Sequence, residues 1–250
     1  MPEITHLLTG FHVNTDQGNL GLCTIALLRG RTNILVDVGH QGRANQLAAA
    51  LERANVPRED IHGVVLTHAH WDHCQNTDMF PNAKIMIHPK ELEYARDPKR
   101  PDLATARYFL NTLEGRDVEK VVEGAEIEPG VRILETPGHT KGHISVLVDT
   151  PEGQVAISGD ALPWANSVVT GQPMIIFWDE KEAAESVRKL LSSSRIFYPG
   201  HDRAFRLGEG NAVEYFSGDD SLRIMLSHDG VGDMTLRVAP DGTMAPTVIG

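Results

Sequence analysis

Short apolar runs that end in turn residues alternate with helical patterns along most of the chain. Residues 33–39 (NILVDVG) form an apolar run closed by glycine, and residues 43–56 have apolar positions at helical spacing. A second apolar run, residues 64–67, leads directly to a histidine-rich segment, residues 67–76 (THAHWDHCQN). The three pieces predict a strand, a helix and a strand in a β-α-β unit. We therefore expect the histidines on the loop after the second strand, where α/β proteins commonly build sites.

The region between residues 83 and 115 predicts one strand followed by helices. Residues 83–89 are strand-like, and residues 90–97 and 101–115 have apolar positions at helical spacing. The second helix would place four apolar side chains on one face: Leu103, Ala106, Leu110 and Leu113. Gly115 would end this helix. Residues 89–115 are expected either to cover the sheet or to form a lid over the site.

Three short apolar runs later in the chain alternate with turn residues. These runs, residues 131–140, 143–150 and 154–161, predict an antiparallel meander. A helix is predicted to begin at Asp179 and to continue to residue 193, because Asp179 and Glu182 together match a capping box.

The last part of the chain is also rich in strand patterns. Residues 195–201 predict a strand followed by a loop, and residues 221–243 predict a closing hairpin that turns near residues 229–233. We find no fixed-period repeat and no clear linker. The prediction is a single α/β domain over residues 1–250, with helices packed outside β-rich halves as in a four-layer αββα sandwich.

Length and composition are those of a folded protein with a sizeable core. The chain has 250 residues, of which 41% are hydrophobic, and no apolar run approaches the roughly 20 residues that a membrane span needs. Residues 1–16 lack the basic head and apolar middle of a signal peptide, so a cytoplasmic protein without membrane partners is expected. The two cysteines, Cys23 and Cys74, are then expected to be reduced thiols. A net charge of −11 disfavours nucleic acid as a partner.

The histidine-rich segment has the chemistry of a metal site. A single loop histidine is usually satisfied by hydrogen bonds, but His68, His70, Asp72 and His73 place four potential ligands in a very short stretch. Residues two apart along an extended loop can point the same way, so His68 and His70 can share one ion. Asp72 and His73 can then turn toward a neighbouring ion.

Three lone polar residues follow apolar strands farther along the chain. They are His139 in TPGHT, Asp160 in SGDA and His201 in YPGH. Each alone is a weak signal, because Gly-His and Gly-Asp are ordinary turn sequences. Together with the first cluster they would complete two coordination shells.

In this order the seven residues resemble the signature of the metallo-β-lactamase-fold hydrolases, over residues 20–205. The resemblance implies a four-layer αββα fold with two divalent metal ions. It implies that His68, His70 and His139 bind one ion, that Asp72, His73 and His201 bind the other, and that Asp160 bridges them. It also implies that Asp37 supports the site from behind the ligands. The spacing is most similar to small hydrolases grouped with metallo-β-lactamase-domain-containing protein 1, including the Phe205–Arg206 pair after the last ligand.

Two adjacent metal ions predict a hydrolase. They lower the pKa of a bridging water and polarise the substrate, so that a metal-bridging hydroxide is available at neutral pH. Asp72 is expected to be catalytic as well as a ligand, because it can accept a proton from the attacking water and pass it to the leaving group. No nucleophilic serine or cysteine is needed, and Cys74 is interpreted as a packing residue. Zinc suits these ligands best, and manganese and iron are compatible with them.

The expected substrate is a small ester, lactone or thioester. Trp71, Trp164 and residues 173–179 would give the pocket apolar walls. Pro163 stands where quorum-quenching lactonases place a tyrosine, which argues against an acyl-homoserine lactone. The predicted C-terminal hairpin differs from the helical domain of glyoxalase II. The interval between Asp160 and His201 is too short for the second domain of the ribonuclease branch.

Other classes of function remain as alternatives. A mononuclear iron dioxygenase of the persulfide type would need fewer ligands than the seven present, and β-lactam hydrolysis is an alternative reaction for the same centre. A non-catalytic metal-binding module would be expected to lack at least one ligand, and none is missing. The hairpin over residues 221–243 offers an edge for a homodimer, although a simple closing hairpin explains it equally well.

Overall fold

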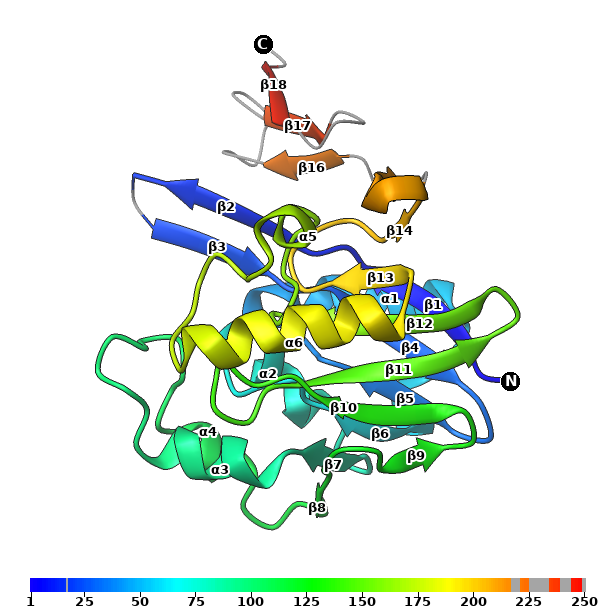
Figure 1. Cartoon of the computed structure of the whole chain (residues 1–250). Coiled ribbons are helices and arrows are strands. Elements are labelled where there is room, and N and C mark those ends of the chain that lie inside the picture. Colours follow the sequence, from blue (N-terminus) through cyan, green and yellow to red (C-terminus); the bar gives the residue numbers. More distant parts are fainter. Residues whose placement is uncertain (17, 217–220, 225–233, 239–243, 249–250) are drawn as a thin grey trace.

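Two mixed β-sheets form the centre of the computed structural model (Figure 1). The structure describes residues 1–250 except 17, 217–220, 225–233, 239–243 and 249–250. The first sheet contains, in spatial order, β1 (Glu3–Leu8), β4 (Ile25–Arg29), β5 (Asn33–Val36), β6 (Ile61–Val65), β7 (Lys84–Ile87) and β8 (Val118–Lys120). The second contains β15 (Val213–Tyr215), β14 (Phe205–Leu207), β13 (Ile196–Pro199), β12 (Gly153–Gly159), β11 (Ile144–Thr150), β10 (Val131–Glu135) and β9 (Glu126–Glu128).

The helices cover the outer faces of these sheets. They are α1 (Ala44–Arg53), α2 (Trp71–Cys74), α3 (Pro89–Arg96), α4 (Phe109–Thr112), α5 (Asn166–Thr170) and α6 (Glu180–Ser193). Figure 1 shows α6, in yellow, lying across the outer face of the second sheet, with α1 on the far side of the molecule. The predicted αββα sandwich is therefore confirmed.

Alternating side chains explain why two sheets and two helical layers pack together. In β4, Ile25 and Leu27 face the core beneath α1, whereas Ala26 and Leu28 face the second sheet. Successive side chains of a strand point to opposite faces, so a strand that is apolar on both faces can serve two cores. A third apolar core, which includes Leu190, lies between the second sheet and α6.

Several predicted elements agree with the structure. The β-α-β unit is β5, α1 and β6, with β5 and β6 parallel, and β10, β11 and β12 form the predicted antiparallel meander. Helix α6 begins as predicted: the Asp179 carboxylate accepts the backbone N–H of Glu182 at 2.9 Å. This bond satisfies one of the free N–H groups of the first helical turn.

The helix predicted over residues 101–115 is wrong for most of its length. Only Phe109–Thr112 is helical, and Leu103 is 89% exposed instead of buried. The Asp102 carboxylate accepts the backbone N–H groups of both Ala104 and Thr105, each at 3.0 Å. This local turn competes with the helical hydrogen bonds of the same segment, which is why apolar spacing alone misled the prediction.

One hairpin and one small three-stranded sheet lie outside the sandwich. The first, β2 (Phe11–Thr15) and β3 (Gly18–Leu22), was not predicted from the sequence. The C-terminal strands β16 (Ser221–Ile224), β17 (Met234–Val238) and β18 (Met244–Val248) form a separate antiparallel sheet beyond β14 (Figure 1). Strands β16 and β17, which pair antiparallel, lie within the range of the predicted closing hairpin, and the predicted turn near residues 229–233 lies outside the described residues.

Candidate metal centre

The first four candidate ligands lie immediately after β6. His68 and His70 occupy the extended segment after this strand, and all four side chains are buried. Asp72 and His73 lie in the short helix α2 and not in an irregular loop as expected. Asp72 and His73 belong to a different group of potential ligands from His68 and His70, although the rings of His68 and His73 lie only 4.2 Å apart between centroids.

The other three candidates come from turns at the ends of second-sheet strands, as predicted. His139 follows β10, Asp160 follows β12 and His201 follows β13. All three side chains are buried. Strands from two sheets therefore carry the seven side chains to one place.

The structure brings the seven residues together as two adjoining groups. Within each group the potential ligand atoms lie within 4.8 Å of one another. The first group, called here the three-histidine group, consists of His68, His70, His139 and Asp160; the second consists of Asp72, His73 and His201. Asp160 also faces the second group, because its Oδ2 lies 3.4 Å from His139 Nε2 and 3.3 Å from His201 Nε2.

Three imidazoles are oriented by acceptors behind them. His73 Nδ1 lies 2.7 Å from Asp37 Oδ2, His139 Nδ1 lies 2.8 Å from the carbonyl oxygen of Ile175, and His201 Nδ1 lies 3.2 Å from that of Leu22. A carbonyl or a carboxylate can only accept, so each Nδ1 carries the proton. In the neutral ring the lone pair of Nε2 is then directed into the cluster. Nearby carboxylates outweigh burial and raise the pKa of His73 and of His201, so a bound cation would take the place of a proton on these two rings.

His70 uses its nitrogens in the opposite sense. Its Nε2 donates to Asp102 Oδ2 at 3.2 Å, which leaves the lone pair of Nδ1 facing His139 Nε2 at 3.0 Å. Asp102 also accepts the hydroxyl groups of Tyr94 and Thr105, both at 2.8 Å. Together these donors outweigh the effect of burial and hold the pKa of Asp102 below its usual range.

Sequence reasoning missed Asp102, although it contacts a candidate ligand directly. Its only sequence signal is the Asp-x-x-Thr spacing to Thr105, which is typical of a local turn. In contrast, Asp37 was expected to support the site, and it contacts the candidate ligand His73 from a left-handed backbone conformation (φ 57°). Its two oxygens accept the backbone N–H and the hydroxyl of Thr67, at 2.8 and 2.9 Å, in addition to holding His73.

The unsatisfied atoms of the cluster fit divalent cations. Among the described residues, His68 Nε2 and Asp160 Oδ1 are buried without a hydrogen-bond partner. Burial and the neighbouring imidazoles lower the pKa of His68, and burial lowers the pKa of His139 to about 4. Both rings are therefore neutral near pH 7. The lone pairs of His70 and His139 face each other at close range, an arrangement that a shared cation would stabilise.

Two glycines make space for the carboxylates. A Cβ atom at Gly21 would lie 2.3 Å from Asp72 Oδ2, and one at Gly200 would lie 2.1 Å from Asp160 Oδ1. Any larger residue at either position would displace a carboxylate from the cluster. The backbone of β3 and of the turn before His201 thus shapes the site as directly as its side chains do.

The two groups open into a small pocket of about 130 Å³. Its walls include Trp71, Trp164, Ile175 and Phe177, as the sequence predicted. Sequence reasoning missed His12, which comes from the β2–β3 hairpin and contacts the Trp164 ring edge-on at 5.5 Å between centroids. Ala104 also lines the pocket. Residues 89–115, which were expected to cover the sheet or the site, therefore border the pocket through an irregular stretch and not through a helix.

The family model of the metallo-beta-lactamase superfamily matches residues 18–201, a range that includes every candidate ligand. The chain belongs to the metallo-β-lactamase superfamily. A probable metallo-hydrolase of Methanocaldococcus jannaschii is 30% identical over 169 residues, which are 68% of this chain and 70% of that protein. Metallo-beta-lactamase domain-containing protein 1 of Xenopus laevis is 28% identical over 209 residues, which are 82% of each protein.

Solved structures of the superfamily share the fold. A Bacillus thuringiensis protein with N-decanoyl-L-homoserine bound at its active site superposes with a TM-score of 0.65 and 22% identity, over 80% of this chain and 92% of that chain. Membership of the superfamily, the resemblance to metallo-β-lactamase-domain-containing protein 1 and the class of metal-dependent hydrolase are confirmed.

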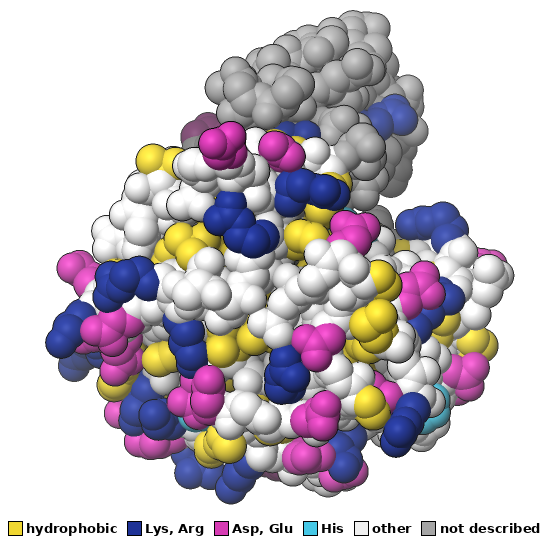
Figure 2. Space-filling model, turned by 45° about the vertical axis from the view of Figure 1, so that its right-hand side comes forward, with side chains coloured by type: hydrophobic (Ala, Val, Ile, Leu, Met, Phe, Trp, Pro, Cys, Tyr) yellow, Lys and Arg dark blue, Asp and Glu magenta, His cyan; other side chains and the backbone are white. Residues whose placement is uncertain are grey.

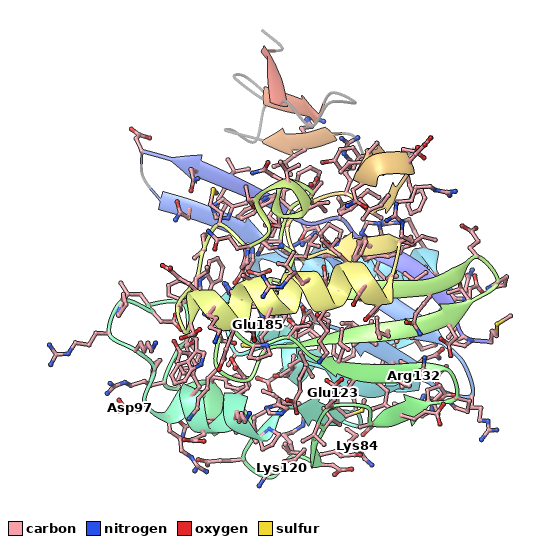
Figure 3. The ribbon with its side chains drawn as sticks, viewed as in Figure 1. Lys84, Asp97, Lys120, Glu123, Arg132 and Glu185 are labelled. Atoms are coloured by element: carbon pink, nitrogen blue, oxygen red, sulfur yellow. The ribbon has the colours of Figure 1, made fainter. Side chains whose placement is uncertain are left out.

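The surface carries mixed charges on the face shown in Figure 2, where Lys and Arg side chains alternate with Asp and Glu. Lys84 and Arg132, labelled in Figure 3, pair with Glu119 at 2.9 Å and Asp149 at 3.1 Å. Glu123, also labelled there, pairs with Lys189. On this face the basic side chains of the described residues are interspersed with acidic ones. Within the described part of the chain, no helix has the length and apolar character needed to cross a bilayer.

Proposed function

We propose that this chain is a dinuclear metallohydrolase that cleaves a small ester, lactone or thioester. His68, His70 and His139 would hold one divalent ion, and Asp72, His73 and His201 the other, with Asp160 between them. The observation that carries this proposal is the direction of the imidazoles. Three rings are held through Nδ1, those of His73, His139 and His201, and the ring of His70 is held through Nε2. Each ring turns its other nitrogen toward the Asp160 side of the cluster.

The ligand types favour zinc, and they also accept manganese or iron. Two bound ions would supply a water that is deprotonated at neutral pH and would polarise the carbonyl oxygen of the substrate. The chain itself would orient the reaction. Asp72 Oδ2, 3.4 Å from His201 Nε2, would accept the proton of the attacking water and deliver it to the leaving group.

The pocket supports the proposed class of substrate. Trp71, Trp164 and Phe177 give it apolar walls, which exclude water from the reacting group and accommodate an apolar acyl chain. The relative with bound N-decanoyl-L-homoserine is consistent with a lactone. Pro163 and Trp164 line the pocket after Asp160, so no tyrosine hydroxyl is available from these positions to contact an acyl-homoserine lactone.

The adjoining groups support two ions better than one. In a persulfide dioxygenase with a single iron, Asp72, His73 and His201 would be buried together with no metal ion to bind. Hydrolysis of a β-lactam would use the same two ions and is a second reaction to assay. The single-domain organisation, the cytoplasmic location and the homodimer stay predictions.

Activity of variants at Asp72 and His70 tests the proposal. The metal-loaded protein should hydrolyse members of a panel of esters, lactones, thioesters and β-lactams. Asp72→Asn should lower kcat by about 10²–10⁴-fold, since both proton transfer and a ligand are affected, and His70→Ala should abolish turnover. Asp78→Asn, a matched change at an exposed aspartate, should leave turnover unchanged. Undiminished turnover in either site variant would contradict the proposal.

A further inference from the structure

Glu91 is a fully buried carboxylate that does not belong to either ligand group. It lies in the first turn of α3, and its exposed fraction is 0%. Its Oε1 accepts the backbone N–H of Ala69 at 2.9 Å. Its Oε2 accepts the hydroxyl of Thr140 at 2.8 Å and the backbone N–H of Gly142 at 2.9 Å. Three donors from two distant segments therefore converge on one carboxylate.

These segments carry the histidines of the three-histidine group. Ala69 stands between His68 and His70, and Thr140 directly follows His139. One segment leaves the first sheet and the other leads into β11 of the second, and one backbone hydrogen bond, from the N–H of Ile144 to the carbonyl oxygen of Thr67 at 2.9 Å, joins them before His68. Glu91 joins them by one hydrogen bond through Oε1 and by two through Oε2.

The backbone is shaped around this link. A Cβ atom at Gly142 would lie only 2.1 Å from the backbone nitrogen of Glu91, so the turn after His139 presses directly on α3. Burial of a carboxylate is also unfavourable in free energy, because the loss of its hydration must be offset by hydrogen bonds. Burial raises the pKa of Glu91, and the bonds from Ala69 and Thr140 oppose that rise. An apolar residue would fill the same volume without this cost.

We propose that Glu91 is a positioning residue that sets the affinity of the three-histidine group for its metal ion by fixing the His68–His70 segment against His139. The inference rests on the proposed function, because it requires that the group binds a divalent ion. Metal affinity depends on how far the ligands are held in place before binding, and groups behind the ligands commonly change it by about 10–100-fold.

Glu91→Gln replaces one of the two acceptor oxygens with a donor nitrogen and leaves the volume of the side chain almost unchanged. A glutamine has only one acceptor oxygen, and its amide nitrogen is a donor. If that nitrogen faces Ala69, the bond to the His68–His70 segment is lost. If it faces Gly142 and Thr140, the bonds to the segment after His139 are weakened. In either orientation the hydrogen bonding of residue 91 to one of the two segments is lost or weakened.

Zinc titration of the metal-free protein against a chromophoric chelator measures the effect. Glu91→Gln is made in a His73→Ala background, which keeps the three-histidine group, and separately in a His70→Ala background, which disrupts it. We expect about tenfold weaker zinc binding in the first background. We expect no change in the second, because the remaining zinc is then held by the Asp72, His73 and His201 group.

Glu128 offers a matched control at the opposite end of the molecule. Its buried carboxylate accepts the backbone N–H of Arg31 at 2.7 Å and the hydroxyl of Thr32 at 2.9 Å, so it joins one distant segment to its own strand. Glu128→Gln should leave zinc affinity unchanged. If Glu91→Gln does not fold, Thr140→Val removes one bond to Glu91, and Thr32→Val is its control. Thr140→Val should weaken zinc binding, and Thr32→Val should not.

The outcomes separate this inference from the proposed function. Weaker zinc binding only where the three-histidine group is intact supports the role of Glu91. An unchanged affinity in the His73→Ala background, or an equal loss in the His70→Ala background or in Glu128→Gln, would overturn that role alone. A wild-type chain that binds no zinc would overturn the proposed function, and the role of Glu91 with it.

Discussion

Asp37 and Asp102 hold two histidines of the cluster through different imidazole nitrogens. Asp37 accepts from His73 Nδ1, whereas Asp102 accepts from His70 Nε2. Each carboxylate thereby selects which nitrogen keeps its lone pair for a cation. The two histidines lie close together in sequence, and the nitrogen that each presents to the cluster is set by the carboxylate behind it.

Asp102→Asn should weaken zinc binding by about 10–100-fold. The asparagine nitrogen would face either the donors of His70 and Tyr94 or the two backbone N–H groups that Oδ1 now accepts. In the first case His70 loses its acceptor, and in the second the turn that holds residue 102 behind His70 loses both backbone hydrogen bonds. Competition with a chelator measures the change. Asp97→Asn, at a 93% exposed side chain labelled in Figure 3, is the control and should bind zinc normally. Equal affinities in both variants would argue against a role for Asp102.

At the scale of elements, the sequence predicts regular structure better than the segments between regular elements. Helix α6 follows from its apolar stripe and from Asp179, and β10 to β12 follow from short apolar runs and turn residues. The helix over residues 101–115 fails because Asp102 bonds to its own backbone and to His70, a contact between distant residues. His12 and Glu91 were missed for the same reason, because their roles depend on what the fold places beside them.

Gly138→Ala tests how one helix positions a candidate ligand. Gly138 has φ 128°, and a Cβ atom there would lie 2.2 Å from the backbone nitrogen of Ala183 in the first turn of α6. The substitution should lower the free energy of unfolding by about 1–3 kcal/mol and should also weaken zinc binding, because the turn before His139 must move. Chemical denaturation and zinc titration measure the two effects.

Asp179→Ala is the matched control for this prediction. It removes the hydrogen bond that begins α6 and should cost about 1 kcal/mol without moving the turn before His139. Zinc affinity should therefore stay at the wild-type value. If Gly138→Ala loses stability but binds zinc as tightly as Asp179→Ala, the contact with α6 has no part in positioning His139.

For the whole molecule, the candidate ligands connect the two sheets. His70 and His73 follow a strand of the first sheet, whereas His139, Asp160 and His201 follow strands of the second. Each ligand group therefore combines side chains from both sheets. A bound ion in either group would link the two halves of the sandwich.

Removal of metal should consequently destabilise the fold. A ligand at about 100 times its Kd stabilises the native state by about 2.7 kcal/mol, which corresponds to a fall in Tm of about 5–10 °C on removal for a chain of this size. Thermal unfolding before and after chelation, and after zinc is restored, measures the difference. A Tm that is the same in all three samples would contradict a link between the sheets.

The most direct test of two metal ions per chain is elemental analysis of protein purified without added metal. Close to two zinc or manganese ions per chain are expected, and a ratio near one in the His70→Ala variant. About one iron per chain and no second metal would contradict the dinuclear hydrolase and would direct the first assay to oxygen consumption with persulfides.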